Sequence, residues 1–192
     1  MNKNRRIFSL FVILALIQLS VLLFMVLRWE DVLTNGQQYR LPAEPVDPYD
    51  PFRGRYVDIR VRGNTEGPIA EGARLQSGQT AYVLLEKDAK GFARIRAVTD
   101  KRPAGSDYIQ TKAGWIEDGD IVHFKLPFNR FYMREDLAPA AERAYRKQAR
   151  KNGVIAVRVK DGYGVIEGLY IGKQTIGEYL LSPETADEDP EE

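Results

Sequence analysis

The sequence predicts a mainly β protein of the α+β class, in which one N-terminal transmembrane helix precedes an antiparallel β domain. Three observations support this prediction. Residues Ile7 to Leu27 carry no charge, short apolar runs separated by turn-forming residues follow, and one stretch at 136–151 has helical character. A partly closed barrel is one arrangement that such strands adopt.

The apolar run from Ile7 to Leu27 is long enough to cross a membrane. At about 1.5 Å per residue a helix of this length reaches roughly 30 Å, the thickness of a bilayer core. Lys3, Arg5 and Arg6 precede it, and the positive-inside rule places a cytoplasmic N-terminus at residues 1–6 and residues 28–192 outside the cytoplasm. We therefore expect a single-pass protein of the inner (cytoplasmic) membrane that contacts lipid through residues 7–27. Trp29 is expected at the far interface.

A cleaved signal peptide is the alternative to a permanent anchor. Such a peptide has a shorter apolar core that ends in small residues, whereas this run continues into Leu27-Arg28-Trp29-Glu30. Arg5-Arg6 also resembles the start of a twin-arginine export signal. We interpret the two arginines as topology signals and predict an uncleaved anchor.

Proline and charge set the boundaries that we expect beyond the anchor. Residues 28–51 are predicted to form a linker, because Pro42, Pro45, Pro48 and Pro51 favour an extended path. Residues 52–181 form the predicted β-rich domain. Residues 182–192 are acidic and lack large apolar side chains, which predicts a disordered tail. The tail is expected to be a solvated segment, and the alternative is a docking peptide for a basic partner. Nucleic acid is not an expected partner of this protein.

Alternation and turn residues predict the strands in order. Residues 56–62 alternate as a half-buried strand, and residues 64–78 form a Gly-rich loop. Residues 80–86 and 92–98 are expected to pair as a hairpin with a five-residue loop. Residues 108–111 form a short strand, and a turn at 117–120 joins 115–116 to 121–126. Asp161-Gly162 gives the strongest hairpin signal, between 154–160 and 163–171, and a further turn at 172–173 precedes residues 175–181.

One helix is predicted from about residue 136 to residue 151. Acidic residues lie at its start and basic residues at its end, which suits the helix dipole. Pro139 falls in the first turn, where proline is tolerated, and Asn152-Gly153 is expected to cap the C-terminus. The basic face could contact anionic lipid, but a solvated face is the expectation.

The residues that most enzymes and metal sites require are scarce. The chain has no cysteine and one histidine, His123, which we interpret as an ordinary strand residue. The acidic residues at 47, 50, 117, 118 and 120 are expected to serve turns, so no metal and no cofactor are predicted. A Ser-Lys dyad needs no histidine and stays open in principle through Ser77, Ser106 or Ser182.

The segment Asp47 to Ile59 has the most distinctive pattern. Proline fixes an extended approach, Gly54 permits a sharp entry into the strand, and Arg53 can pair with Asp47 or Asp50. The favoured interpretation is a structural clamp. The alternative is a binding site in which arginine and Tyr56 meet a carboxylate or phosphate near the membrane.

With its N-terminal span, the pattern Asp47-Pro48, Asp50-Pro51-Phe52-Arg53-Gly54 and Tyr56 resembles the GDYXXLXY family of membrane-anchored bacterial proteins of unknown function. The chain departs from the family at Arg55 and Val61, which replace an aspartate and a tyrosine. Residues 129–135, with Arg130 and Tyr132, are similar to the family's aromatic strand before the helix. The resemblance implies no reaction, but it implies an accessory role beside multi-pass membrane proteins.

These observations lead to one expected function and one alternative. We expect a membrane-tethered, non-catalytic accessory or binding domain that acts with a membrane-protein partner. The candidate binding residues, for which a structural role is the other interpretation, are Asp47, Asp50, Arg53, Gly54, Tyr56, Arg130 and Tyr132. The alternative is a membrane-anchored Ser-Lys hydrolase of signal-peptidase type.

Overall fold

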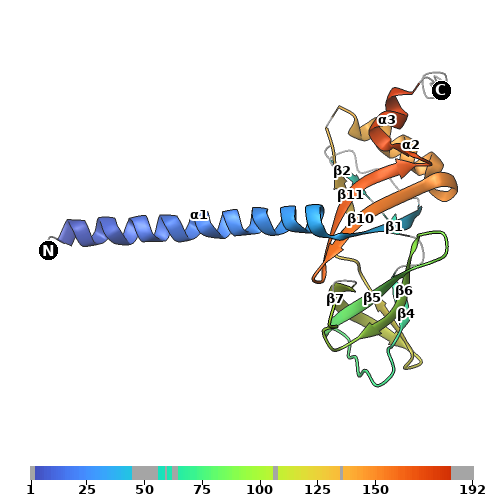
Figure 1. The fold of residues 1–192 in the computed structure, drawn as a ribbon, viewed down its shortest axis with the longest axis horizontal. Coiled ribbons are helices and arrows are strands. Elements are labelled where there is room, and N and C mark those ends of the chain that lie inside the picture. Colours follow the sequence, from blue (N-terminus) through green and yellow to red (C-terminus); the bar gives the residue numbers. More distant parts are fainter. Residues whose placement is uncertain are drawn as a thin grey trace.

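The computed structural model describes residues 3–44, 56–58, 60–61, 65–105, 108–134 and 136–182. A long helix, α1 (Lys3–Asn35), projects away from the rest of the chain, and two β lobes lie at its C-terminal end (Figure 1). The predicted combination of an apolar N-terminal helix and an antiparallel β domain is confirmed. Of the predicted site, Asp47, Asp50, Arg53 and Gly54 lie outside the described residues, as do tail residues 183–192.

Helix α1 extends beyond the apolar run at its C-terminal end. It is the one described helix that is long and apolar enough to cross a membrane. The large apolar side chains from Ile7 to Leu27 are exposed, because no other part of the described chain covers them. The helix then continues through Arg28 to Asn35 without a break. An apolar surface of this size needs an apolar environment, which a bilayer provides.

The first lobe, called the sheet lobe, contains a five-stranded sheet in the order β12-β11-β10-β1-β3. Its strands are β1 (Gln37–Glu44), β3 (Arg60–Val61), β10 (Gly153–Lys160), β11 (Tyr163–Ile171) and β12 (Gln174–Thr175). The predicted β10–β11 hairpin is confirmed. Asp161 and Gly162 have φ values of 52° and 89°, and positive values at both central residues are what a type I′ turn requires.

The prediction of a linker over residues 28–51 is wrong for residues 28–44. Residues 28–35 complete α1, and residues 37–44 form β1, which lies between β10 and β3. Tyr39, Leu41 and Ala43 are buried on alternate positions of this strand. Burial of these three side chains outweighs the preference of Pro42 for a solvated extended chain, and Pro42 itself lies opposite Val154 in the sheet.

The second lobe, called the barrel lobe, is a nearly closed five-stranded barrel in the order β4-β8-β7-β5-β6. Its strands are β4 (Glu66–Pro68), β5 (Thr80–Lys87), β6 (Ala93–Thr99), β7 (Tyr108–Glu117) and β8 (Ile121–Phe124). The amide of Ala70 donates to the carbonyl of Val98 at 2.8 Å and brings the two outer strands together. The predicted β5–β6 hairpin is confirmed, whereas residues 108–117 form one continuous strand.

Short elements connect and cover the two sheets. A ribbon pairs β2 (Tyr56–Asp58) with β9 (Arg130–Tyr132), so the predicted strand at 56–62 is found as the two short strands β2 and β3. The predicted helix is α2 (Ala138–Asn152), with Pro139 in its first turn. Gly153 does not adopt the left-handed conformation of a helix cap, because its φ is −70° and it begins β10 directly. The third helix, α3 (Ile176–Leu181), is short and follows β12.

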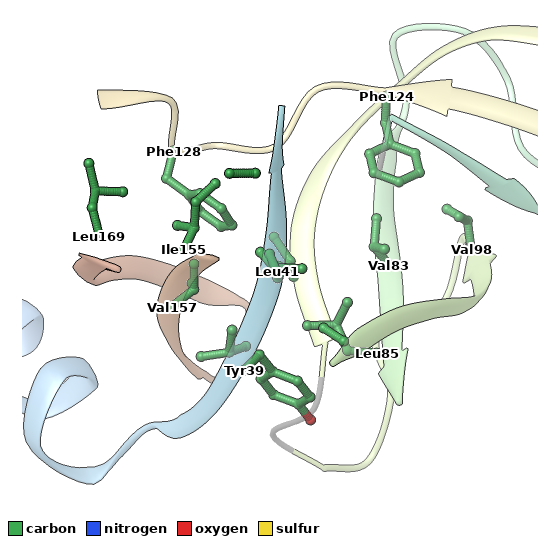
Figure 2. Packing of buried hydrophobic residues seen from close by; sticks show 14 of the residues in the cluster. Tyr39, Leu41, Val83, Leu85, Val98, Phe124, Phe128, Ile155, Val157 and Leu169 are labelled. Atoms are coloured by element: carbon green, nitrogen blue, oxygen red, sulfur yellow. The ribbon is translucent and has the colours of Figure 1, made fainter. Parts of the chain in front are cut away.

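A single apolar cluster joins the two lobes. Figure 2 shows that side chains of β1 lie between those of β10 and β11 and those of the barrel. Tyr39 and Leu41 contribute from β1, Val157 from β10, and Val83 from β5. The lobes therefore share one core, which makes the domain one folding unit.

Candidate functional site at the helix–domain junction

The last turns of α1 contact the β10–β11 hairpin through specific side chains. The ammonium group of Lys160 donates to both carboxylate oxygens of Asp31, at 2.7 and 2.8 Å. The guanidinium of Arg28 lies 3.9 Å from the centre of the Tyr163 ring, and the indole of Trp29 meets the same ring edge-on at 5.7 Å. The end of the helix is thus held against the β10–β11 hairpin by three of its side chains.

Hydrogen bonds of Gly36 hold the C-terminal end of α1 against β10. The amide of Gly36 donates to the carbonyl of Val32 at 2.9 Å, and the carbonyl of Gly36 accepts from Arg158 at 3.1 Å. A Cβ atom at Gly36 would lie 2.3 Å from the carbonyl oxygen of Val32, so only glycine permits this approach. Val32 itself is 3% exposed.

A half-buried polar cluster supports this turn. Arg158 donates to Glu167 at 2.9 Å, and the amide nitrogen of Gln38 donates to the same carboxylate at 2.6 Å. The hydrogen bond from Arg158 lowers the pKa of Glu167 below its ordinary value, and the bond from Gln38 adds to this effect. The cluster joins β1, β10 and β11 directly beneath the end of α1.

Beside the junction lies a pocket of about 440 Å³, called the junction pocket. Its lining comes from α1, from β9 with the preceding segment, and from β11, and includes Trp29, Asn129, Arg130, Phe131, Tyr132 and Val165. The indole of Trp29 is 42% exposed and Tyr132 is 67% exposed. Because Trp29 is the second residue after the apolar run, the pocket lies at the level where a bilayer core would end.

The structure brings together part of the predicted site. Arg130 and Tyr132 both line the junction pocket, and Tyr56 lies opposite Tyr132 in the β2–β9 ribbon. Whether the segment from Asp47 to Gly54 is a clamp or a binding site stays a prediction, because that segment lies outside the described residues. The sequence predicts Trp29 at the membrane interface but does not place it in one pocket with Arg130, since that placement depends on the docking of α1.

A second pocket, of about 750 Å³, lies in the barrel lobe and is called the barrel pocket. It is lined by β7, by β8 and by the segment after β8, and includes Lys112, Trp115, His123 and Lys125. The ring of His123 stacks on that of Trp115 with 3.5 Å between centroids and 10° between planes. The ring nitrogens of His123 lie 3.5 Å from Glu66 and 3.3 Å from Glu117.

The remaining predicted chemistry is dispersed over the described chain. Residues 117–120 form the β7–β8 turn, with Asp118 at a φ of 48°. Of the three candidate serines, Ser182 donates to the carbonyl of Tyr179 at 2.7 Å, Ser77 lies in the exposed loop before β5, and Ser106 is outside the described residues. Within the described ranges, no group of three or more His, Cys, Asp or Glu side chains is arranged to hold a metal ion.

Comparison with known proteins identifies the family. The family model described as GDYXXLXY protein matches residues 18–169, from within the apolar helix to β11. No curated protein and no solved structure matches the chain. Since the match covers most of the sequence, the chain belongs to the GDYXXLXY protein family.

Proposed function

We propose that this protein is a membrane-tethered, non-catalytic accessory domain that acts with a membrane-protein partner in the inner membrane. The observation that carries the proposal is the continuity of α1 with the domain. A flexible tether would let the domain sample many orientations. The contacts of Arg28, Trp29 and Asp31 with the β10–β11 hairpin instead hold the domain in one orientation on its helix.

The same continuity supports a permanent anchor with a cytoplasmic N-terminus. The segment Leu27-Arg28-Trp29 lies within α1 and not in an extended segment suited to cleavage. Arg5 and Arg6 at the start of the helix favour retention of that end in the cytoplasm. The domain then lies outside the cytoplasm and next to the bilayer, where its most accessible partners are other proteins of the same membrane.

The junction pocket is the surface that we assign to the partner. Tryptophan, tyrosine and arginine are the residue types that carry most of the binding energy at protein interfaces, and Trp29, Tyr132 and Arg130 line this pocket together. Phe131 and Val165 add apolar lining. The partner segment that suits this lining is a juxtamembrane stretch with an apolar side chain and a carboxylate.

Site-specific photo-crosslinking in intact membranes tests the proposal. A photoreactive residue at Tyr132 is expected to form a discrete adduct with a membrane protein, because this side chain is exposed at the pocket. The matched control is Lys173, an exposed residue in the β11–β12 turn, where no adduct of that size is expected. Adducts of lipid and solvent alone at Tyr132, or the same protein adduct at both positions, would refute the proposal.

A further inference from the structure

We propose that the barrel pocket is a docking surface for anionic phospholipid headgroups, so that the domain contacts the bilayer at a second place besides α1. This inference rests on the proposed membrane span but not on the proposed protein partner. It concerns a different pocket from the one assigned to that partner.

The lining of the barrel pocket is cationic. Lys112 and Lys125 are exposed within it, and neither ammonium group forms an ion pair with a residue that the structure describes. None of the described lining residues carries a carboxylate. Glu66 and Glu117 contact the ring of His123, which lines the pocket, and neither forms an ion pair with Lys112 or Lys125. Two ammonium groups without an ion-pair partner in the described part of the chain, beside the exposed hydroxyl groups of Thr65 and Thr80, suit a phosphate ester.

The aromatic part of the pocket is held rigidly at the surface. A β-bulge between Ala113 and Ile116 turns Trp115 outward, and its side chain is 57% exposed. A Cβ atom at Gly114 would lie 2.7 Å from the carbonyl oxygen of His123, so glycine permits the close pairing at this bulge. His123 supports one face of the indole. An exposed, supported tryptophan is typical of proteins that contact the headgroup layer.

Contacts between the lobes place the Gln110 end of β7 beside the β10–β11 hairpin, and so near the end of α1. The amide of Gln110 on β7 donates to the carbonyl of Gly162 at 2.8 Å. Gly162 is two residues from Lys160, which is paired with Asp31 of α1. Asp31 is four residues beyond Leu27, or about 6 Å along the helix axis. In Figure 1, β7 lies on the side of the barrel lobe that faces back toward the N-terminal part of α1.

The barrel pocket is also continuous with the junction pocket. Pro127 lines both of them, so one surface extends from Trp29 on α1 to Trp115 on the barrel. Tryptophan at both ends and lysine near one end are the residues that anchor proteins at a membrane surface. Each lysine close to an anionic membrane surface strengthens binding by about fivefold.

The test uses the full chain in lipid nanodiscs. The chain has two tryptophans, so the Trp29→Phe background leaves Trp115 as the only indole. A nitroxide attached to lipid headgroups is expected to quench Trp115 emission in discs that contain phosphatidylglycerol, and to quench it much less in discs of phosphatidylcholine alone. The double variant Lys112→Glu/Lys125→Glu is expected to lose this difference. The matched control Lys90→Glu/Lys101→Glu, on exposed residues of the β5–β6 turn and the segment after β6, is expected to keep it.

Three results would overturn the inference. The first is equal quenching in both kinds of disc, and the second is equal loss of quenching in both double variants. The third is an emission change on adding free glycerol phosphate to the protein in phosphatidylcholine discs, because that result would assign the pocket to a soluble anion. The discs contain no partner protein, so failure here leaves the crosslinking prediction intact, and failure to crosslink leaves this result intact. Failure of the chain to enter discs would instead refute the membrane span.

Discussion

The turn that joins α1 to the domain gives the sharpest stability prediction, through the substitution Gly36→Ala. The new Cβ atom would lie 2.3 Å from the carbonyl oxygen of Val32, a separation that real Cβ atoms do not show. Either the helix end or β10 must move by about 1 Å to remove the overlap, and overpacking of this kind costs about 1–3 kcal/mol. The shift would also weaken the hydrogen bond from Gly36 to Val32, which is worth about 1 kcal/mol.

Together, the overpacking and the weakened hydrogen bond predict that the free energy of unfolding falls by about 2–4 kcal/mol. For a domain of this size the melting temperature would fall on the order of 10 °C. The assay is thermal unfolding of the full chain in detergent micelles, with tryptophan emission as the signal. In the same sample, spin labels on Glu30 and Lys173 are expected to show a broader distance distribution than in the original protein.

Gly177→Ala is the matched control. Gly177 lies in α3, and a Cβ atom there would meet nothing within 4 Å. Alanine in place of a helical glycine is expected to raise stability by about 0.5–1 kcal/mol. If Gly36→Ala melts at or above the temperature of the original protein, with an unchanged distance distribution, the junction is not held as we infer.

Three further predictions concern stability. Tyr145 is 2% exposed and its hydroxyl has no hydrogen-bond partner among the described residues. Tyr145→Phe is therefore expected to leave the free energy of unfolding unchanged or to raise it by about 1 kcal/mol, whereas Tyr145→Ala is expected to lower it by about 3–5 kcal/mol. A lower free energy of unfolding for the phenylalanine variant in urea titrations would contradict this. The pKa of Glu167 is lowered by Arg158, so the stability that it contributes is present above the unfolded pKa of about 4.5 and is lost as the pH falls through the lower folded pKa. Glu167→Gln should therefore unfold with a flatter pH dependence below about pH 5 than the original protein, and parallel curves would contradict the assignment. Thr175 forms a capping box with Glu178 at the start of α3. Thr175→Ala is therefore expected to lower the free energy of unfolding by about 1 kcal/mol, and Thr175→Ser to lower it much less. Equal losses for the two variants in calorimetry would show that the hydroxyl is not the cause.

Local chemistry accounts for most of the elements that the sequence predicts correctly. The apolar helix depends on composition alone, and the β10–β11 hairpin depends on two residues, Asp161 and Gly162, that tolerate positive φ. β1 was missed because four prolines in residues 42–51 outweighed the alternation of Tyr39, Leu41 and Ala43. The alternation indicates a buried strand only when β10, which is distant in the sequence, pairs with it.

The candidate site could be predicted only in part, for a related reason. Arg130 and Tyr132 were named through the family resemblance, and the structure places both at the junction pocket. The contribution of Trp29 depends on the pairing of Asp31 with Lys160, two residues that are far apart in the chain. A hairpin turn can be read from neighbouring residues, but a contact of this range is set by the packing of the whole domain.

The position of β1 has a consequence for the order of folding. β1 follows α1 directly, yet its partner β10 begins only at Gly153. Closing so long a loop is slow, and residues 37–42 gain their hydrogen bonds to β10 only at the end of that search. During synthesis, the edge of β1 that pairs with β10 therefore stays open, with Tyr39 and Leu41 uncovered, until nearly the whole domain has been made. A chain truncated before Gly153 would present this open strand edge with its apolar side chains, which is the kind of segment that aggregates or is removed by quality-control proteases.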